Sequence, residues 1–98
     1  MVWTVQFTGT AKKQARKLPE NAYDSFKLLI KDLQIFGPVL SKWPNFGKIA
    51  DKSQCYHCHI KKGRPTYVAV WKVNAKDIKC IEVCYVGTHE NANYERIC

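Results

Sequence analysis

Three strand-like runs dominate the second half of the chain: CYHCHIK at 55–61, TYVAVWKV at 66–73 and KCIEVCYV at 79–86. The short breaks between them are Lys62-Gly63-Arg64-Pro65 and Asn74-Ala75-Lys76-Asp77. Strands joined by short turns predict an antiparallel meander. Because the last two runs are apolar on nearly both faces, we place them at the centre of the sheet.

The first half predicts one more strand and two helices. Residues 2–8 alternate apolar and polar side chains, which is typical of a half-buried strand. From Thr10 to Pro19 the spacing is helical, and a second helix then carries one apolar stripe made of Ala22, Phe26, Leu29, Ile30, Leu33 and Phe36. The short link makes the helices fold back on each other. The predicted fold class is α+β, in the order β-α-α-β-β-β, with a two-helix hairpin on one face of an antiparallel sheet.

Residues 39–53 predict a loop segment, because Gly37 and Pro38 precede them and Pro44 and Gly47 interrupt them. We expect Trp43 and Phe46 to pin this loop to the core. Other aromatic residues lie at periodic apolar positions and are expected in the core. These are Trp3, Phe26, Phe36 and Trp71.

The length of 98 residues suits a single domain, residues 1–98. No run approaches the roughly 18–20 apolar residues that cross a bilayer, and the opening Met1-Val2-Trp3-Thr4 is unlike a signal peptide, so we expect a cytoplasmic protein. The five cysteines, Cys55, Cys58, Cys80, Cys84 and Cys98, are an odd number without the pattern of a disulfide framework, and we expect reduced thiols.

The chain is strongly basic, with 16 Lys and Arg against 8 Asp and Glu and a formal net charge of +8. Such an excess favours polyanionic partners, among them RNA phosphates and acidic proteins. The plainer alternative is a surface that only keeps the protein in solution.

Alternation along 55–61 places His57, His59 and Lys61 on one face of the predicted strand, with about 7 Å between successive side chains. Lys62 and Arg64 follow in the turn. His89 leaves the last strand at the same sheet edge, because neighbouring strands of a meander run antiparallel. The sequence therefore predicts imidazoles and cations together on the open face of the sheet.

A zinc site built from Cys55, His57 and His59 is a competing interpretation, since these residue types bind zinc. Cys58 points to the opposite face of the strand, and zinc-binding pairs usually surround a turn. We therefore expect no metal and no other cofactor at these residues.

The stretches Cys58-His59-Ile60, 67–73 and Tyr85-Val86-Gly87-Thr88-His89-Glu90 resemble the RelE/ParE toxin superfamily, and most closely its YafQ-like branch. The resemblance implies a toxin of a toxin–antitoxin pair, usually a ribosome-dependent messenger RNA endonuclease that works without a metal and is held inactive by an antitoxin. It implies that His59 and His89 are catalytic. That branch has Arg where this chain has Tyr85, so the transition-state cation must come from Lys61, Lys62 or Arg64.

The remaining predicted RNA contacts are His57, Lys62, Tyr94, Lys12, Lys13 and Arg16. The predicted partners are the ribosome, messenger RNA and an acidic, partly disordered antitoxin that covers the Lys61-Lys62-Arg64 turn, and the free toxin is expected to be a monomer. Two alternatives stay open: a non-catalytic gyrase-binding toxin of the ParE kind, and a decayed member that acts only as a repressor with its antitoxin.

Overall fold

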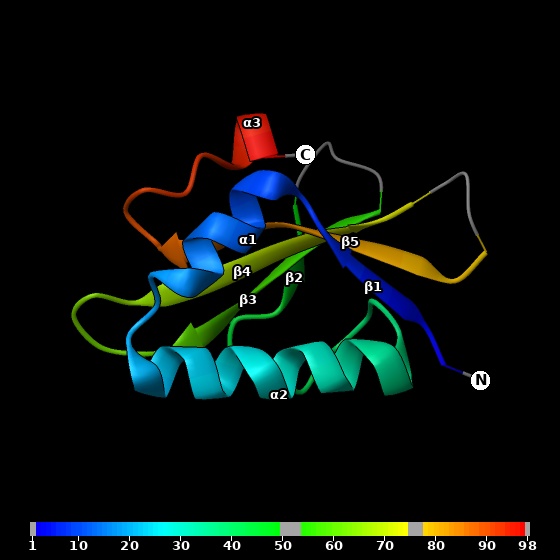
Figure 1. The fold of residues 1–98 in the computed structure, drawn as a ribbon, viewed down its shortest axis with the longest axis horizontal. Helices are drawn as coiled ribbons and strands as arrows, with labels where there is room; N and C mark the ends of the chain where they lie inside the picture. Colours follow the sequence, from blue (N-terminus) through cyan, green and yellow to red (C-terminus); the bar gives the residue numbers. More distant parts are fainter. Residues whose placement is uncertain (1, 50–53, 75–77, 98) are drawn as a thin grey trace.

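The structure is a computed structural model, and it describes residues 2–49, 54–74 and 78–97. It contains both predicted helices and all four predicted strands, together with two short elements (Figure 1). The strands are β1 (Thr4–Phe7), β2 (Gly47–Lys48), β3 (Cys55–Lys61), β4 (Tyr67–Val73) and β5 (Cys80–Thr88). The helices are α1 (Gly9–Arg16), α2 (Glu20–Phe36) and α3 (Tyr94–Ile97).

The strands form one sheet in the order β1-β5-β4-β3-β2. The meander of β3, β4 and β5 is antiparallel, and β4 is the central strand of the sheet. β1 pairs with β5 in parallel, so the sheet is mixed. The α+β fold class is confirmed with this refinement, because the alternation in β1 indicates which face is buried but not which way the strand runs.

The segment predicted as a loop, 39–53, contains the two-residue strand β2, which pairs with β3. Two residues are too few to show an alternating pattern, so the sequence gives no sign of this strand. The predicted anchors of the segment are confirmed. The indole Nε1 of Trp43 donates a 2.8 Å hydrogen bond to Asp32 Oδ2, and Phe46 stacks on Tyr56 with 5.7 Å between ring centroids.

Both long helices pack on one side of the sheet around a shared core. The hydroxyl of Thr8 accepts a 3.0 Å hydrogen bond from the Ala11 amide and begins α1, and α2 buries the stripe Ala22, Phe26, Leu29 and Leu33. The centre of this core is Trp71, which is fully buried and donates from Nε1 to the Pro38 carbonyl at 2.9 Å.

Phe36 was predicted in the core, and this prediction is wrong, because its side chain is 68% exposed. Phe36 is the last residue of α2, and the chain turns at Gly37 with a φ of 86°. A Cβ at Gly37 would lie 2.8 Å from the Trp3 indole nitrogen. Trp3 therefore occupies the space beside the helix end, and Phe36 is left on the outside.

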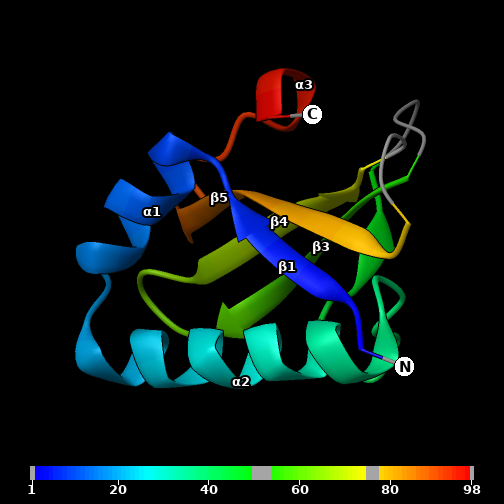
Figure 2. The same cartoon turned by 45° about the vertical axis from the view of Figure 1, so that its right-hand side comes forward.

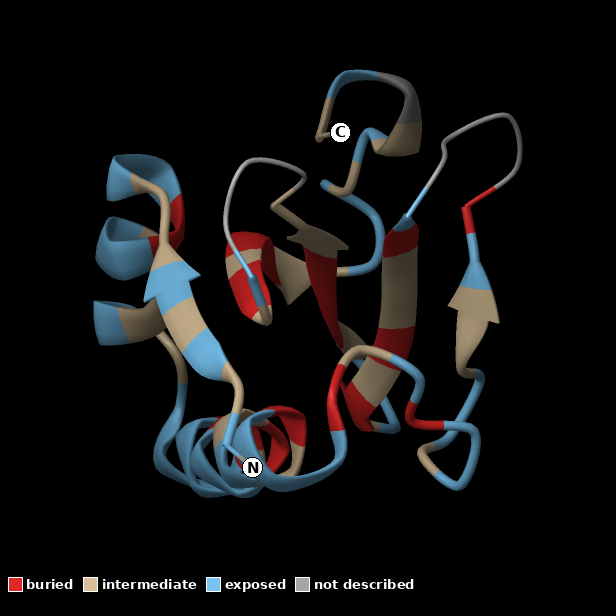
Figure 3. Ribbon diagram, turned by 90° about the vertical axis from the view of Figure 1, so that its right-hand side faces the viewer, coloured by how far each residue is buried: buried red, intermediate tan, exposed pale blue. Residues whose placement is uncertain are grey.

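The other face of the sheet has a smaller core, under the C-terminal segment. Figure 2 shows the sheet between α2 on one side and α3 on the other. The buried residues here are Ile49, Cys55, Val68, Val70 and Tyr85, and Ala92, Tyr94 and Ile97 pack against them. Figure 3 shows buried residues along the strands and exposed residues on the outer sides of α1 and α2.

Cysteine chemistry differs from the expectation at one position. Cys58, Cys80 and Cys84 are free and buried, as expected for small core side chains. Cys55 is disulfide-bonded, so the expectation of a reduced thiol is wrong there. Cys98 lies outside the described residues.

Among the described residues, no helix has both the length and the apolar character to cross a membrane.

Candidate active site

Four aromatic side chains meet on the face of the sheet opposite α2, and we call them the histidine cluster: His57, His59, His89 and Tyr94. The rings of His59 and His89 are 5.7 Å apart, those of His57 and Tyr94 are 5.3 Å apart, and those of His89 and Tyr94 are 6.4 Å apart. The cluster unites residues of β3, the exit of β5 and α3. The structure thus brings together both histidines that the resemblance implied.

Strand register explains this meeting. His59 pairs with Val68 of β4, and Val68 pairs with Gly87 of β5, so the end of β5 lies two strands away from His59. The His89 amide then donates a 2.8 Å hydrogen bond to the Thr66 carbonyl, which continues the β4–β5 pairing beyond the strand end. The antiparallel argument from sequence therefore predicted the correct sheet edge for His89.

Lys61 departs from the alternation that placed it beside His59. The β3–β4 register shifts between His59 and Lys61, and Lys61 pairs with Tyr67, whose side chain packs on the helix-side core. A bulge of this kind interrupts the period of two. Lys62 is the cation whose charge acts on His59. Arg64 is exposed in the turn that follows.

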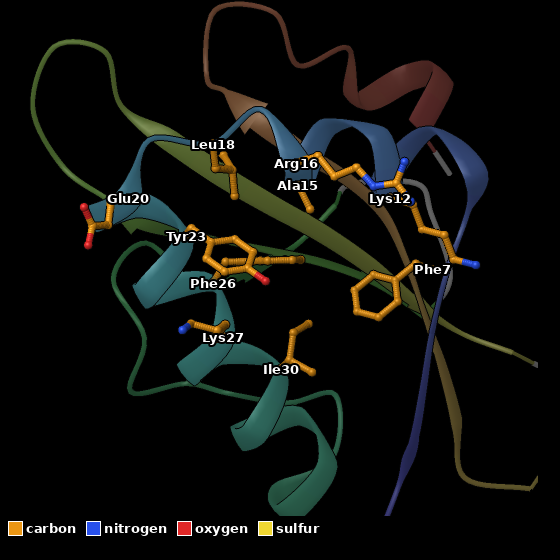
Figure 4. A pocket seen from close by; sticks show the side chains of 10 residues that line it. All are labelled: Phe7, Lys12, Ala15, Arg16, Leu18, Glu20, Tyr23, Phe26, Lys27 and Ile30. Carbon is orange, nitrogen blue, oxygen red and sulfur yellow. The ribbon is translucent and has the colours of Figure 1, made fainter.

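Two basic residues of α1, Lys12 and Arg16, line a groove on the helix side of the sheet. Lys12, Lys13 and Arg16 are exposed. Figure 4 shows Lys12 and Arg16 beside the groove between α1 and α2, near Phe7 and Phe26. The structure does not bring these three predicted RNA contacts to the histidine cluster.

Burial and mutual repulsion lower the pKa of two imidazoles in the cluster, those of His57 and His59. Burial is the largest cause that lowers the pKa of His57, and the charges of His59 and His89 lower it further. Burial also lowers the pKa of His59, followed by the charges of His89 and Lys62. Nδ1 of His57 is buried, and it has no hydrogen-bond partner among the residues that the structure describes. At neutral pH, His59 is therefore held in the form that accepts a proton.

Tyr85 stands where the YafQ-like branch has Arg, and the structure gives it a packing role. Its side chain is 8% exposed, and its hydroxyl donates a 2.8 Å hydrogen bond to the Thr88 carbonyl. Burial is the largest cause that raises its pKa, so the hydroxyl stays protonated. Tyr85 therefore fixes the backbone just before His89.

Gly87 lies directly under the Tyr85 ring, and Gly87→Ala is expected to disturb the site. A Cβ there would lie 2.8 Å from the Tyr85 hydroxyl oxygen and 3.1 Å from Cζ. Relieving such an overlap typically costs about 1–3 kcal/mol of stability. The measurement is urea unfolding, with Gly9→Ala as control, since a Cβ at Gly9 meets nothing within 4 Å. Equal unfolding midpoints for Gly87→Ala and the parent would contradict this packing.

Comparisons with known proteins identify the fold. No protein-family model matches the chain, and no curated protein matches its sequence. A free mutant of the toxin RelE from E. coli superposes with a TM-score of 0.75 and 19% identity, over 97% of this chain and 92% of that chain. The chain has the RelE toxin fold.

Two further structures with the RelE fold agree. A chain of the archaeal RelE-RelB complex from Pyrococcus horikoshii has a TM-score of 0.71 and 21% identity, over 94% of this chain and all of that chain. The YoeB dimer from Staphylococcus aureus has a TM-score of 0.70 and 15% identity, over 91% of this chain and 99% of that chain. In both comparisons, the similarity covers nearly the whole length of this chain and of the other chain.

Two features of the site on this RelE fold were missed by sequence reasoning. The first is the contact between Tyr85 and Gly87. The sequence does not indicate it, because it depends on how the Tyr85 ring lies over its own strand. The second is the bulge after His59: Lys62 was among the predicted cations, but spacing did not show that Lys61 would leave the face of His59. The glycine in the Lys62-Gly63 turn indicates an irregular backbone, but residue spacing does not predict where Lys62 lies relative to the imidazoles.

Proposed function

We propose that this chain is the toxin of a toxin–antitoxin pair and that it cleaves messenger RNA on the ribosome. The RelE fold, the toxin structures that share it and the net charge of +8 support the proposal. The observation that carries it is the 5.7 Å approach of His59 and His89 beside a cation. Two imidazoles this close together can both contact one phosphate.

The proposed reaction needs only protein groups and the RNA itself. The 2′-hydroxyl of one nucleotide attacks its own 3′-phosphorus and loses its proton to a general base. The bond from phosphorus to the 5′-oxygen of the next nucleotide breaks, and a general acid protonates that oxygen. The products are a 2′,3′-cyclic phosphate and a free 5′-hydroxyl, so atoms and charge balance.

We assign His59 as the base and His89 as the acid. Burial, His89 and Lys62 lower the pKa of His59 and keep it neutral, as a base requires. His89 is the other imidazole within reach, and it is exposed, so it can exchange protons with water between turnovers. Lys62 supports the charge that develops on the phosphate, with Arg64 as a further cation of the same hairpin.

The other cluster members position the substrate. The ring of Tyr94 lies between those of His57 and His89, where it can stack on a base; such contacts are typically worth about 1–3 kcal/mol. Lys12 and Arg16 line the groove between α1 and α2, away from this site, and together with Lys13 they are proposed to contact ribosomal RNA. A cytoplasmic location follows from a ribosomal substrate.

Cleavage should fall at acid pH, with a midpoint below 6.5, because His59 must be deprotonated and its pKa is lowered. Lys62→Ala removes one cause of that lowering, so the midpoint should rise toward 6.5. The measurement is the pH–rate profile of cleavage from about pH 5 to 8, normalised to each protein's plateau, with Lys31→Ala as control. A downward shift in Lys62→Ala would contradict the assignment of the base.

An acidic antitoxin is proposed to cover the Lys61-Lys62-Arg64 turn, since the charge of +8 favours an anionic segment that folds on binding. Affinity for the protein encoded by the adjacent reading frame should fall as salt rises. Titration calorimetry at low and high salt tests this, and a dissociation constant that does not change would contradict it.

The proposed function is tested by expressing the chain with and without that adjacent reading frame. We expect growth arrest from the chain alone, together with site-specific cuts in translated messages, and relief of both on co-expression. Naked RNA should be cut poorly, because a shallow sheet face cannot by itself hold a flexible strand in line for attack. Growth arrest with intact messages and damaged DNA would instead indicate a gyrase-binding toxin.

A further inference from the structure

A groove beside the histidine cluster is used by none of the chemistry above, and we call it the β5 groove. It consists of two hollows that meet at Tyr85 and Asn91. The first, of about 340 Å³, lies between α1 and the end of β5, where it is lined by Gln14, Lys17, Tyr67, Gly87 and Thr88. The second, of about 350 Å³, lies between the start of α1 and the C-terminal segment, where it is lined by Thr8, Thr10, Asn93 and Arg96.

The groove exists because β1 is shorter than β5. β1 pairs with β5 only over Cys80–Val83, and the outer edge of β5 beyond that point faces α1. There, Gln14 Oε1 accepts a 3.1 Å hydrogen bond from the Val86 amide in place of a strand partner. The register shift in β5 after Val83 turns the Tyr85 side chain to the face of the sheet opposite α2, where it lines both hollows.

The groove leads directly to the histidine cluster. Thr88 immediately precedes His89, and Asn91 follows it by two residues. Both of these residues line the first hollow. A polymer whose reactive phosphate contacts His59 and His89 could therefore continue from the histidine cluster into the groove.

The charges of the groove favour an anion. Lys17 and Arg96, both exposed, lie in different hollows. No Asp or Glu is among the described residues that line either hollow. Glu90 acts on Tyr85 from nearby but lines neither hollow. The lining between the two cations also includes hydroxyls, amides and the Tyr85 ring, which can contact sugars and bases, beside the apolar side chains of Leu18, Val86 and Ile97.

We infer that the β5 groove binds the single-stranded RNA that flanks the cleaved nucleotide. Each hollow is at the small end of the roughly 300–1,000 Å³ range of small-molecule sites, so each suits about one nucleotide. Lys17 and Arg96 contact phosphates, and Asn91 lies at the junction between successive nucleotides. The inference rests on the proposed function in taking RNA as the ligand.

A partner protein fits a different part of the molecule better. The groove between α1 and α2, of about 690 Å³, is lined by Phe7, Leu18, Phe26 and Ile30 and offers the continuous apolar floor that an amphipathic segment needs (Figure 4). The β5 groove is instead divided at Tyr85 into two hollows, each about half that volume, and Lys17 lines one while Arg96 lines the other. We therefore assign it to RNA.

The test measures how affinity depends on RNA length. The probes are fluorescein-labelled 2′-O-methyl oligonucleotides of three and nine residues, which cannot be cleaved, and fluorescence anisotropy gives the dissociation constants. The variant is Lys17→Ala/Arg96→Ala. Its control is Lys31→Ala/Lys42→Ala, which removes two exposed lysines of α2 and the following loop. Circular dichroism and melting temperatures verify that all proteins fold.

We expect the parent and the control to bind the nine-residue probe at least tenfold more tightly than the three-residue probe. The groove variant should lose this gain, and its salt slope for the longer probe should fall by about 1.4, or about 0.7 for each lost phosphate contact. Its affinity for the short probe should stay unchanged. Because the probes are uncleavable, these results do not depend on whether the protein is a nuclease.

Three results would overturn the inference. The first is an equal affinity of the groove variant and the parent for the longer probe. The second is an equal loss for both probe lengths or in the control, which would indicate general charge only. The third is an equal loss for polyglutamate, which would assign the groove to an acidic protein. In contrast, we expect His59→Ala to lose cleavage but to keep the parental gain in affinity from the three-residue to the nine-residue probe. That result would show that the groove and the catalytic site act separately.

Discussion

Replacing His59 or His89 with Ala is expected to lower the ribosome-dependent cleavage rate by about 10²–10⁴-fold, the usual contribution of one proton-transfer group. The two imidazoles act in one reaction, so the double variant should be scarcely slower than the worse single variant. Neither side chain belongs to a core cluster, and each change should cost less than about 1 kcal/mol of stability. The measurements are single-turnover cleavage and thermal unfolding.

Two controls separate proton transfer from shape. His59→Gln and His89→Gln keep a polar side chain of similar size but do not titrate, so they should be as inactive as the Ala variants. Lys31→Ala lies on the exposed side of α2 and should cleave at the parental rate. If the Ala variants fold, bind ribosomes and cleave like the parent, the active site lies elsewhere.

Trp71→Ala should cost about 3–5 kcal/mol of unfolding free energy, the largest stability effect that we expect from a single substitution. Trp71 is fully buried in the helix-side core and lies 6.2 Å from Phe46, measured between ring centroids. Its removal leaves a large cavity and also the unpaired Pro38 carbonyl. Small domains have roughly 5–15 kcal/mol of stability in total, so the variant should be close to unfolding at 37 °C.

Trp71→Phe separates the cost of the cavity from the cost of the lost hydrogen bond. Phenylalanine fills most of the cavity but cannot donate to Pro38, so we expect an intermediate loss of about 1–3 kcal/mol. Urea unfolding of the three proteins gives the values. A loss below 1 kcal/mol in Trp71→Ala would show that the core does not depend on this residue.

Sequence periodicity predicted the elements well where several residues share one pattern. The run 55–61 became β3 with the same bounds, and the helix after Pro19 ends at Phe36, before Gly37. Periodicity failed where a single tertiary contact decides. Phe36 belongs to the apolar stripe, but Trp3 occupies the space beside the end of α2 and leaves Phe36 outside the core. The strand β2 forms only because it pairs with the edge of β3.

The site was predictable to the level of the sheet edge. The antiparallel order of β3, β4 and β5 placed His89 near His59, and the structure has them together. The orientation of Lys61 could not be predicted, because the bulge after His59 depends on pairing with Tyr67. The disulfide at Cys55 was equally hidden, since an odd cysteine count in strand-like runs indicates free thiols. The catalytic roles of the two histidines stay predictions.

The most direct test of the central claim is cleavage of a messenger RNA on purified ribosomes, with chemical analysis of both new ends. The account predicts cuts that require the ribosome, carry a 2′,3′-cyclic phosphate and a 5′-hydroxyl, and disappear in His59→Ala and His89→Ala. Intact messenger RNA with the folded parent protein, or cuts that persist at the parental rate in both variants, would contradict it.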